Sequence, residues 1–377
     1  MFIDGLKIYQ DFDIDLIPVQ YRELFVKVDL QTGNLTDDFE ERSHSFRHKA
    51  SHSTSVGIRI RQGRIEVNGN PSRINRLDNL FGYTTIDQCV FVFNSILSEY
   101  QLPPFTKATK LNHLQSKDGK HSKQVTDGAV IQEIHLTTNR SIGEGNTHSY
   151  LKAISNQKYR NSMPNLHSNG CSVDWRSKLG KATLIYPTIY DKANELTVHL
   201  IPKIKREYGS QSKEFKYVKK LHQYCTEQGV IRFEQKLKSE YLRRHKLNHY
   251  GLINFEALKK LHQEFLDIDK RLKVNNMKLE NISEQLINEG ICKSTLSANC
   301  TAGYAYQWMH GSKMDLSKKQ VQTHRARLRK IGIDIGLPCD LTRFSPVVVK
   351  DVQELHIKDL AVPHWYKKPV TQLQLVA

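Results

Sequence analysis

A tyrosine and a lysine stand at the end of an apolar run, in the segment Thr183–Leu196. Tyr190 is followed two positions later by Lys192, and Tyr186 lies four positions before it. A tyrosine hydroxyl has an unperturbed pKa of about 10, so near neutral pH it attacks phosphorus only with help from a cation or a metal. The segment therefore offers a candidate nucleophile and a helper cation, which suit cleavage of a phosphodiester with one end kept covalently attached.

Candidate metal ligands lie in two strand-like segments on either side of this tyrosine, at 130–137 and 230–237. The alternation of polar and apolar residues in the first segment puts Glu133 and His135 on the same face of a strand. In the second segment, Glu234 is the corresponding carboxylate. Carboxylate oxygens favour Mg²⁺, and one imidazole shifts the preference towards Mn²⁺. We therefore expect Glu133, His135 and Glu234 to bind Mg²⁺ or Mn²⁺.

Each of these residues has a simpler structural interpretation when it is taken alone. The chain has 16 Tyr and 17 His, and a tyrosine beside an apolar run or a histidine in a strand usually serves packing. Arg232 and Glu234 could form an ion pair on an exposed face, worth about 0–1 kcal/mol. The chemical interpretation depends on the whole set of residues together with the resemblance described next.

The chain resembles the replication initiators of filamentous phages, the gene II protein family, almost from end to end. The matching segments are Met1–Leu6, Gly69–Ile74, Asp78–Gly82, Ile134–Thr137, Trp175, Thr183–Leu184, Tyr190–Lys192 with Glu195–Leu196, Ile231–Glu234 and Trp365–Pro369. One departure is His135, because the family more commonly has an aspartate there. Both side chains can hold a divalent metal, so the resemblance keeps the ligand role for His135.

This resemblance implies rolling-circle DNA replication. A family member binds the double-stranded phage origin, nicks one strand and joins its tyrosine to the 5′ phosphate. The free 3′ hydroxyl primes a host DNA polymerase while a host helicase unwinds the duplex, and a second cleavage releases and seals the single-stranded circle. The phosphotyrosine ester conserves the bond energy, so resealing needs no ATP, and the sequence contains no G-x-x-x-x-G-K-[ST] loop.

Two tyrosines compete for the role of nucleophile, because some rolling-circle initiators use two in alternation. Pro187 lacks an amide donor and argues against a continuous helix through Tyr186 and Tyr190. We favour Tyr190, since Lys192 and Glu195 match the family motif around it. Tyr186 is then a packing or DNA-stacking residue, with a second catalytic role left open.

Two other functions share parts of this pattern. A relaxase or transposase-like nuclease of a mobile element would use the same chemistry, but it predicts a paired His-hydrophobic-His motif, and Ile134-His135-Leu136 supplies one histidine. A basic DNA-binding regulator without catalysis would also fit the net charge. A covalent protein–DNA adduct separates the enzymes from the regulator.

The composition agrees with a nucleic-acid partner. The formal charge is +17, which predicts attraction to phosphate backbones and a strong salt dependence of binding. Ribosomal and membrane-surface proteins can carry a similar charge. The chain has no secretory signal and no long apolar run, so we expect it in the cytoplasm of the host bacterial cell, with no membrane partner. Its six cysteines form neither a C-x-x-C pair nor a zinc spacing, which predicts reduced thiols.

The pattern of elements predicts an α+β fold, with a central antiparallel sheet in a nuclease domain at 1–250 and a mainly helical region at 251–377. Strands are expected at 25–30, 56–61 and 64–67, and helices at 85–100, 212–228 and 254–273. The polar stretch 37–54 is typical of a loop, although His44, His48 and His52 are spaced by four and would line one face of a helix. The polar stretch 107–127 predicts a second loop.

The best candidate for binding double-stranded DNA is a helix-turn-helix at 302–330. Its first helix is expected at 302–311, and its second begins at a Ser317 cap. The second helix carries six cations and no acid, namely Lys318, Lys319, Arg325, Arg327, Arg329 and Lys330. A plain surface helix explains the same pattern. Related phages also make a short carboxyl-terminal product, for which Met277 is a candidate start.

Overall fold

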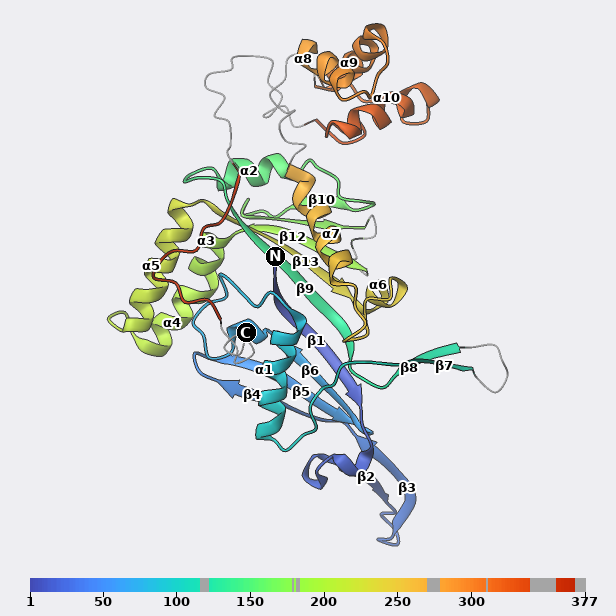
Figure 1. Cartoon of the computed structure of the whole chain (residues 1–377), viewed down its shortest axis with the longest axis vertical. Helices are drawn as coiled ribbons and strands as arrows, with labels where there is room; N and C mark the ends of the chain where they lie inside the picture. The colour runs from blue at the N-terminus through green and yellow to red at the C-terminus, as the bar shows by residue number, and fades with distance from the viewer. Residues whose placement is uncertain are drawn as a thin grey trace.

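The computed structural model describes residues 1–115, 122–177, 180, 184–269, 279–309, 311–339 and 357–369. Met277, the candidate internal start, lies outside these residues. The fold is mixed α+β, as the sequence predicts, and a large antiparallel sheet forms its centre (Figure 1). Among the described residues, no helix is long and apolar enough to cross a membrane.

The main sheet has ten strands, in the order β10-β11-β12-β13-β9-β1-β6-β5-β4, with β14 pairing the end of β9. Two hairpins, β2–β3 and β7–β8, project from it (Figure 1). The strands are β1 Phe2–Asp11, β2 Glu23–Val28, β3 Leu35–Arg42, β4 His44–Ala50, β5 Thr54–Arg61, β6 Arg64–Gly69, β7 Leu111–Gln115, β8 Ser122–Thr126, β9 Val130–Ser141, β10 Met163–Leu166, β11 Ser172–Arg176, β12 Ile185–Asp191, β13 Val230–Lys238 and β14 Lys358–Asp359.

The helices pack in several groups. They are α1 Ile86–Glu99, α2 Thr147–Ile154, α3 Lys192–Glu195, α4 Ile201–Tyr208, α5 Lys213–Glu227, α6 Ser239–Arg244, α7 Phe255–Leu266, α8 Leu279–Asn288, α9 Thr295–Met309 and α10 Lys319–Lys330. Capping residues fix three starts that the sequence predicts. Thr85 and Gln88 form a reciprocal capping box at α1, Ser212 accepts a hydrogen bond from Phe215 N at α5, and Asn254 does so from Ala257 N at α7.

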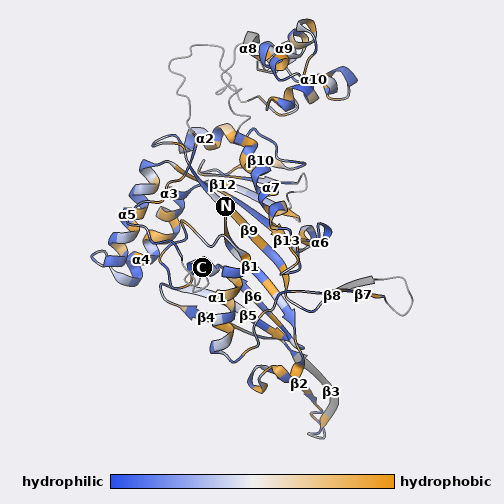
Figure 2. Cartoon of the chain, viewed as in Figure 1, coloured by the Kyte–Doolittle hydropathy of each residue, from blue (hydrophilic) through white to orange (hydrophobic). Residues whose placement is uncertain are grey.

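One face of the sheet is apolar and covered by helices. Alternate residues of the central strands, such as Ile8, Ile58 and Ile134, are buried in one core with side chains of α1, α6 and α7. The alternation of hydrophobic and hydrophilic colour along β1 and β9 is visible in Figure 2. Full burial of one such side chain, for example Phe93 on α1, contributes about 1.5–3 kcal/mol. This face therefore fixes the register of the strands.

The opposite face is polar, and the register of the strands shows that it is continuous. Directly opposed residues of antiparallel strands share a face. Lys7 of β1 is opposite Asn68 of β6 and Glu133 of β9, and Glu133 is opposite Lys238 of β13. Further out, Arg59 of β5 is opposite Glu66 of β6. We call this surface the polar face of the sheet.

Two smaller units complete the fold. Helices α3, α4 and α5 pack with Leu80, Val230 and Tyr366 in a separate apolar cluster. Helices α8, α9 and α10 share another cluster, which includes Trp308 and Leu328. Several helices thus follow the sheet in the chain, as the sequence predicts.

Some predicted elements were wrong. The expected loop at 37–54 contains β3 and β4, and the expected loop at 107–127 contains β7 and β8. The β2–β3 and β7–β8 hairpins are two-stranded sheets and β4 is an edge strand of the main sheet, so the usual apolar alternation is weak in these strands. The three histidines of the first stretch contact different partners, with His44 on Glu23, His48 on Tyr100 and His52 on Tyr208. They do not form the helical metal face that their spacing allowed.

Three helix boundaries also differ from the sequence prediction. The helix expected at 254–273 ends at Leu266 in α7, and the first helix of the proposed pair begins at Thr295 in α9. Ser317 does not cap α10, because its hydroxyl donates to Asp315 Oδ1 at 2.6 Å. Lys318 occupies the cap position without a side-chain hydrogen bond.

Candidate active site

Tyr190 and its neighbours lie on the polar face, across strands β12, β13 and β9. Tyr190 is directly opposite Arg232, and Arg232 is opposite Asn139. Two residues further along β13, Glu234 is opposite Thr137 of β9. After another two residues, Lys236 is opposite His135. The sheet register therefore gathers side chains that are far apart in the sequence.

A chain of close contacts joins the predicted nucleophile to the predicted metal ligands. The Tyr190 hydroxyl donates to Glu234 Oε2 at 3.3 Å. Glu234 Oε1 lies 3.4 Å from His135 Nδ1, and His135 Nε2 lies 2.7 Å from Glu133 Oε1. Thus Tyr190, Glu234, His135 and Glu133, all proposed from sequence, are brought together.

Gly5 on β1 leaves the room that His135 occupies. A Cβ atom at Gly5 would lie 2.6 Å from His135 Nδ1, closer than real contacts allow. The imidazole therefore packs directly against the β1 backbone. This contact explains why the opening segment of the chain belongs to the site.

The electrostatics of these side chains favour an ion pair. Burial lowers the pKa of His135, but its hydrogen bonds with Glu133 and Glu234 outweigh burial and raise that pKa above its ordinary value. Burial raises the pKa of Glu234, but the hydrogen bond with His135 and the positive charges of His135, Lys236 and Arg232 together outweigh burial and lower that pKa. At neutral pH, Glu234 is therefore a carboxylate, and it accepts the hydrogen bond of the Tyr190 hydroxyl.

Tyr190 itself stays protonated. Burial raises the pKa of its hydroxyl well above the ordinary value, and the guanidinium of Arg232 opposes this shift. The residue as a whole is partly exposed, whereas its hydroxyl is buried against Glu234. Attack on phosphorus thus requires both removal of the proton and stabilisation of charge.

Buried charges lie next to Tyr190. Arg232 is fully buried, and its Nη1 atom lies 3.6 Å from Asp4 Oδ2 with no hydrogen-bond partner among the described residues. Lys192 is 1% exposed, and its Nζ donates to Glu195 Oε2 at 2.6 Å. Burial and the nearby Arg232 lower the pKa of Lys192, and Glu195 opposes them. Two buried cations are thus close to the candidate nucleophile, since Arg232 is directly opposite Tyr190 and Lys192 follows it by two residues, and perturbed buried charges are typical of functional sites.

The start of α3 places Lys192. Asp191 caps this helix by accepting from Asn194 N, and its other oxygen accepts from the Thr147 hydroxyl at 2.8 Å. A π-helical turn, Leu196–Leu200, follows and leads into α4. The strand thus ends at Asp191, and α3 begins at once with Lys192, whose side chain is buried.

Tyr186 has a different environment. It lies on the same face of β12 as Tyr190, but its hydroxyl donates to Asp174 Oδ2 at 2.6 Å. Asp174 is fully buried and also accepts from Arg176 Nη2 at 2.6 Å. Tyr186 therefore belongs to a hydrogen-bonded cluster on β10–β12, and Tyr190 is the tyrosine that contacts Glu234.

Two carboxylates and one imidazole suit Mg²⁺ or Mn²⁺, and these donors come from Glu133, Glu234 and His135. Both ring nitrogens of His135 are within reach of carboxylate oxygens. In the described part of the chain, no group of three His, Cys, Asp or Glu side chains is already arranged around an ion position. A metal would therefore have to replace the proton that His135 now shares with its neighbours.

The cations proposed on α10 fall into two groups. Arg325 Nε donates to Asp334 Oδ1 at 2.6 Å, and Arg327 Nη1 donates to Ser297 Oγ at 2.8 Å, so both are engaged within the α8–α10 unit. The exposed members are Lys318, Lys319, Arg329 and Lys330. The exposed cations thus lie at the two ends of α10.

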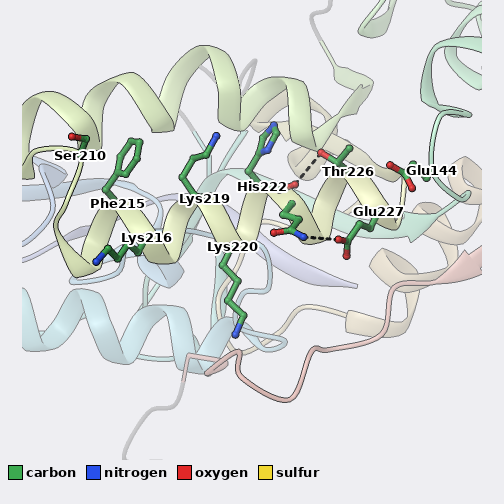
Figure 3. Close-up of a pocket in the computed structure, with 10 residues that line it drawn as sticks. Glu144, Ser210, Phe215, Lys216, Lys219, Lys220, His222, Thr226 and Glu227 are labelled. Carbon is green, nitrogen blue, oxygen red and sulfur yellow. Dashed lines mark hydrogen bonds between the residues drawn. The ribbon is translucent and has the colours of Figure 1, made fainter.

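A shallow depression of about 700 Å³ lies along the outer side of α5 (Figure 3). Lys219 and Lys220 point to opposite sides of the helix, and Lys220 Nζ lies 4.7 Å from the Trp365 ring centroid. Gln223 donates to Glu227 at 2.8 Å, so polar groups here bond to each other. We place no part of the candidate site in this depression.

Sequence reasoning missed Arg232, Asp4 and Asn79. The sequence suggested Arg232 only as half of an exposed ion pair, but it is fully buried and Glu234 is 8% exposed. Asp4 lies at a bulge, between Ile3 and Gly5 in the pairing of β1 with β9. The available signals were the family segments Met1–Leu6, Asp78–Gly82 and Ile231–Glu234, which contain Asp4, Asn79 and Arg232.

Comparison with known proteins identifies the family of the chain. Residues 26–256 match the model of the N-terminal family of the gene II replication-associated protein, and residues 286–372 match the model of its C-terminal family. The chain is also 51% identical over 314 residues to the replication-associated protein of Escherichia phage If1, and the alignment covers 83% of this chain and 98% of that protein.

The chain belongs to the gene II family of filamentous-phage replication-associated proteins. The resemblance seen in the sequence is therefore confirmed. The N-terminal family match contains Tyr190, His135 and Glu234, and the C-terminal family match contains α10 and the segment 357–369. Asp4 lies before the matched residues. No solved structure matches the chain.

Proposed function

We propose that the chain is a rolling-circle DNA replication initiator that nicks one strand of a phage origin and later rejoins it, with Tyr190 as nucleophile. The observation that carries this proposal is the contact of the Tyr190 hydroxyl with Glu234, beside two buried cations, in a chain of the gene II family. The enzyme class is then a metal-dependent DNA endonuclease and strand transferase.

The chemistry follows from the residues around Tyr190. The phenolic oxygen attacks the phosphorus of the scissile phosphodiester, and its proton passes by way of Glu234 Oε2 to water. A bond forms between the tyrosine and the 5′ phosphate, while the bond to the 3′ oxygen breaks and that oxygen takes a proton from water. Arg232 and Lys192 stabilise the negative charge that develops at the phosphate. Rejoining is the reverse reaction, and it needs no ATP because the ester conserves the bond energy.

Glu133, His135 and Glu234 are the residues that would hold Mg²⁺ or Mn²⁺. When bound, the ion supplies Lewis-acid polarisation of the phosphoryl oxygens. His135 would bind it in place of the aspartate that is more common in the family. Its imidazole would shift the preference towards Mn²⁺ relative to an all-carboxylate site.

The remainder of the polar face suits a DNA strand. Lys7, Lys236 and Lys238 are partly exposed beside the site, and Arg59 and Arg61 are exposed further out on β5. The path from β12 to β5 crosses five strand spacings, roughly 24 Å. Positive groups along such a path attract a phosphate backbone, and this supports the proposal that the strand bound at Tyr190 extends across the sheet.

Other parts of the proposed function come from the family alone. The double-stranded origin would be recognised with the exposed cations of α10, and a host helicase and DNA polymerase would act on the nicked DNA in the bacterial cytoplasm. Tyr186 would assist by stacking on DNA or by packing.

A covalent adduct tests the proposal. Purified protein is incubated with single-stranded fragments that tile the phage origin, with and without Mg²⁺, and separated under denaturing conditions. A fragment-specific, metal-dependent adduct supports the initiator. Sequence-independent binding with no adduct from any fragment would support the non-catalytic regulator instead.

A further inference from the structure

The segment Gly69–Gly82, which we call the signature loop, carries the most specific amino-terminal motif of the sequence. Its fold against β1 is tightly constrained. The Ser72 hydroxyl donates to the Ile3 carbonyl at 3.2 Å and accepts from Tyr83 N at 2.8 Å. A Cβ atom at Gly82 would lie 2.6 Å from the Phe2 ring and 2.8 Å from Ser72 Oγ. The loop is thus built to hold one conformation.

The inner side of the signature loop contacts the buried charges of the site. Asn79 Nδ2 donates to Asp4 Oδ1 at 2.8 Å, and Asn79 Oδ1 accepts from Lys192 Nζ at 3.2 Å. The carbonyl of Asn79 also accepts from Arg232 Nη2 at 2.6 Å. One residue therefore contacts both cations and the carboxylate between them.

The outer side of the same loop contacts the C-terminal segment, residues 357–369. The buried Tyr366 donates its hydroxyl to Asp78 Oδ1 at 2.7 Å and accepts from Phe81 N at 3.1 Å. Arg76 Nη2 donates to the Tyr366 hydroxyl at 3.0 Å and to the Lys367 carbonyl at 2.8 Å. The hydroxyl thus uses its one hydrogen and both lone pairs on the signature loop.

Other contacts attach the C-terminal segment to the sheet and to α5. Lys358 and Asp359 form β14 and pair with Ser141 and Arg140 at the end of β9. The Tyr224 hydroxyl of α5 donates to the Ala361 carbonyl at 2.5 Å. The segment therefore runs from the end of β9 past α5 to the signature loop, although it comes from the far end of the chain (Figure 1).

We propose that the C-terminal segment is part of the catalytic machinery: it clamps the signature loop, and through Asn79 the loop sets Lys192 and Arg232 beside Tyr190. Asn79 and Tyr366 are positioning residues, because they act on the reaction through the two cations. This inference rests on the proposed function and extends it. A protein without the segment would keep Tyr190, Glu234 and His135 in place but would hold its two cations loosely.

Three variants separate positioning from simple attachment. Asn79→Ala removes the contacts with Asp4 and the Lys192 side chain, and Tyr366→Phe removes one hydroxyl from the clamp. Tyr224→Phe is the matched control, since its hydroxyl also bonds the C-terminal segment but donates to Ala361, away from the signature loop. Each variant is first compared with the full-length chain by melting temperature and circular dichroism.

The measurement is the rate of covalent adduct formation with an origin oligonucleotide at increasing concentration. Misplaced catalytic groups typically cost up to about 10²-fold, so we expect Asn79→Ala and Tyr366→Phe to lower the maximal rate about 10–100-fold. The half-saturating oligonucleotide concentration should change by less than about twofold, because neither residue lies on the exposed polar face. Tyr224→Phe should keep both quantities near those of the wild type.

Wild-type maximal rates for folded Asn79→Ala and Tyr366→Phe variants of the full-length chain would overturn the inference. Absence of any adduct from the wild-type chain would instead overturn the proposed function, and the inference with it.

Discussion

Arg59 and Arg61 provide the sharpest test of where the DNA strand lies. Both are exposed on the polar face of β5, and neither has an acidic partner among the described residues. Arg59 makes a long hydrogen bond to Ser43 Oγ, at 3.5 Å. Arg64, by contrast, is held by Asp11 through two hydrogen bonds of 2.6 and 2.8 Å. Arg59 and Arg61 are therefore the cations best placed to meet phosphates.

The size of the effect follows from counterion release. Each phosphate contact with a single strand contributes about 0.7 to the slope of log affinity against log salt, so the double variant Arg59→Gln/Arg61→Gln should lower that slope by about 1.4. Between about 50 and 200 mM salt, the affinity of the variant should then fall about sevenfold less than that of the wild type.

Fluorescence anisotropy with a labelled single-stranded origin oligonucleotide measures this slope. The control is Lys259→Gln/Lys260→Gln on α7, which removes the same charge from a helix that covers the opposite face of the sheet. Its slope should stay close to that of the wild type. If both double variants lower the slope equally, the binding reflects net charge alone. If the Arg59 and Arg61 variant keeps the wild-type slope, the strand does not cross β5.

Three further predictions concern the metal, α10 and a buried histidine. His135→Ala and Glu234→Ala should each slow adduct formation on the order of 10²–10³-fold while anisotropy shows nearly unchanged origin binding, and full activity in EDTA would exclude a metal role. Replacing the exposed cations of α10 by Gln should lower the slope of log affinity against log salt for double-stranded origin DNA by about 0.9 for each phosphate that is no longer neutralised. Arg325→Gln should mainly lower the melting temperature, because Arg325 pairs with Asp334. Equal slopes in all these variants would assign the helix to packing. His262 is 1% exposed, and burial, with smaller contributions from the amino terminus and Arg140, lowers its pKa to about 3. Below about pH 6.5 the unfolded chain binds a proton that the folded chain excludes, so His262 should cost about 1.4 kcal/mol of stability per pH unit as the pH falls towards 3. His262→Gln should remove that part of the slope in urea unfolding at about pH 7, 6 and 5, and an unchanged slope would mean that the folded protein accepts the proton.

The apolar part of the fold is well predicted from sequence. Helices α1, α5 and α7 have clear caps at Thr85, Ser212 and Asn254, and the strands that face the core alternate strongly. The sequence predicts a loop in place of β3 and β4 because they contain few apolar residues, and only their pairing with neighbouring strands identifies them as part of a sheet. Non-local hydrogen bonding of this kind leaves little trace in a local pattern.

The candidate site was predicted in part for a related reason. Alternation along β9 places Glu133 and His135 on one face, and β13 and β12 bring Glu234 and Tyr190 next to them. Arg232 was beyond sequence reasoning, since an arginine two positions from a glutamate usually marks an exposed face. Its burial depends on Asn139 from β9 and on carbonyl groups of a distant loop.

The role of Tyr190 as nucleophile is the central claim, and the position of the phosphate in the adduct tests it most directly. Wild-type protein is trapped on an origin oligonucleotide, digested with protease and nuclease, and the modified peptide is sequenced by mass spectrometry. We predict that the 5′ phosphate is attached to Tyr190, and that Tyr190→Phe forms no adduct while it still binds the oligonucleotide. A phosphate on Tyr186, or an adduct of normal yield from Tyr190→Phe, would contradict the account.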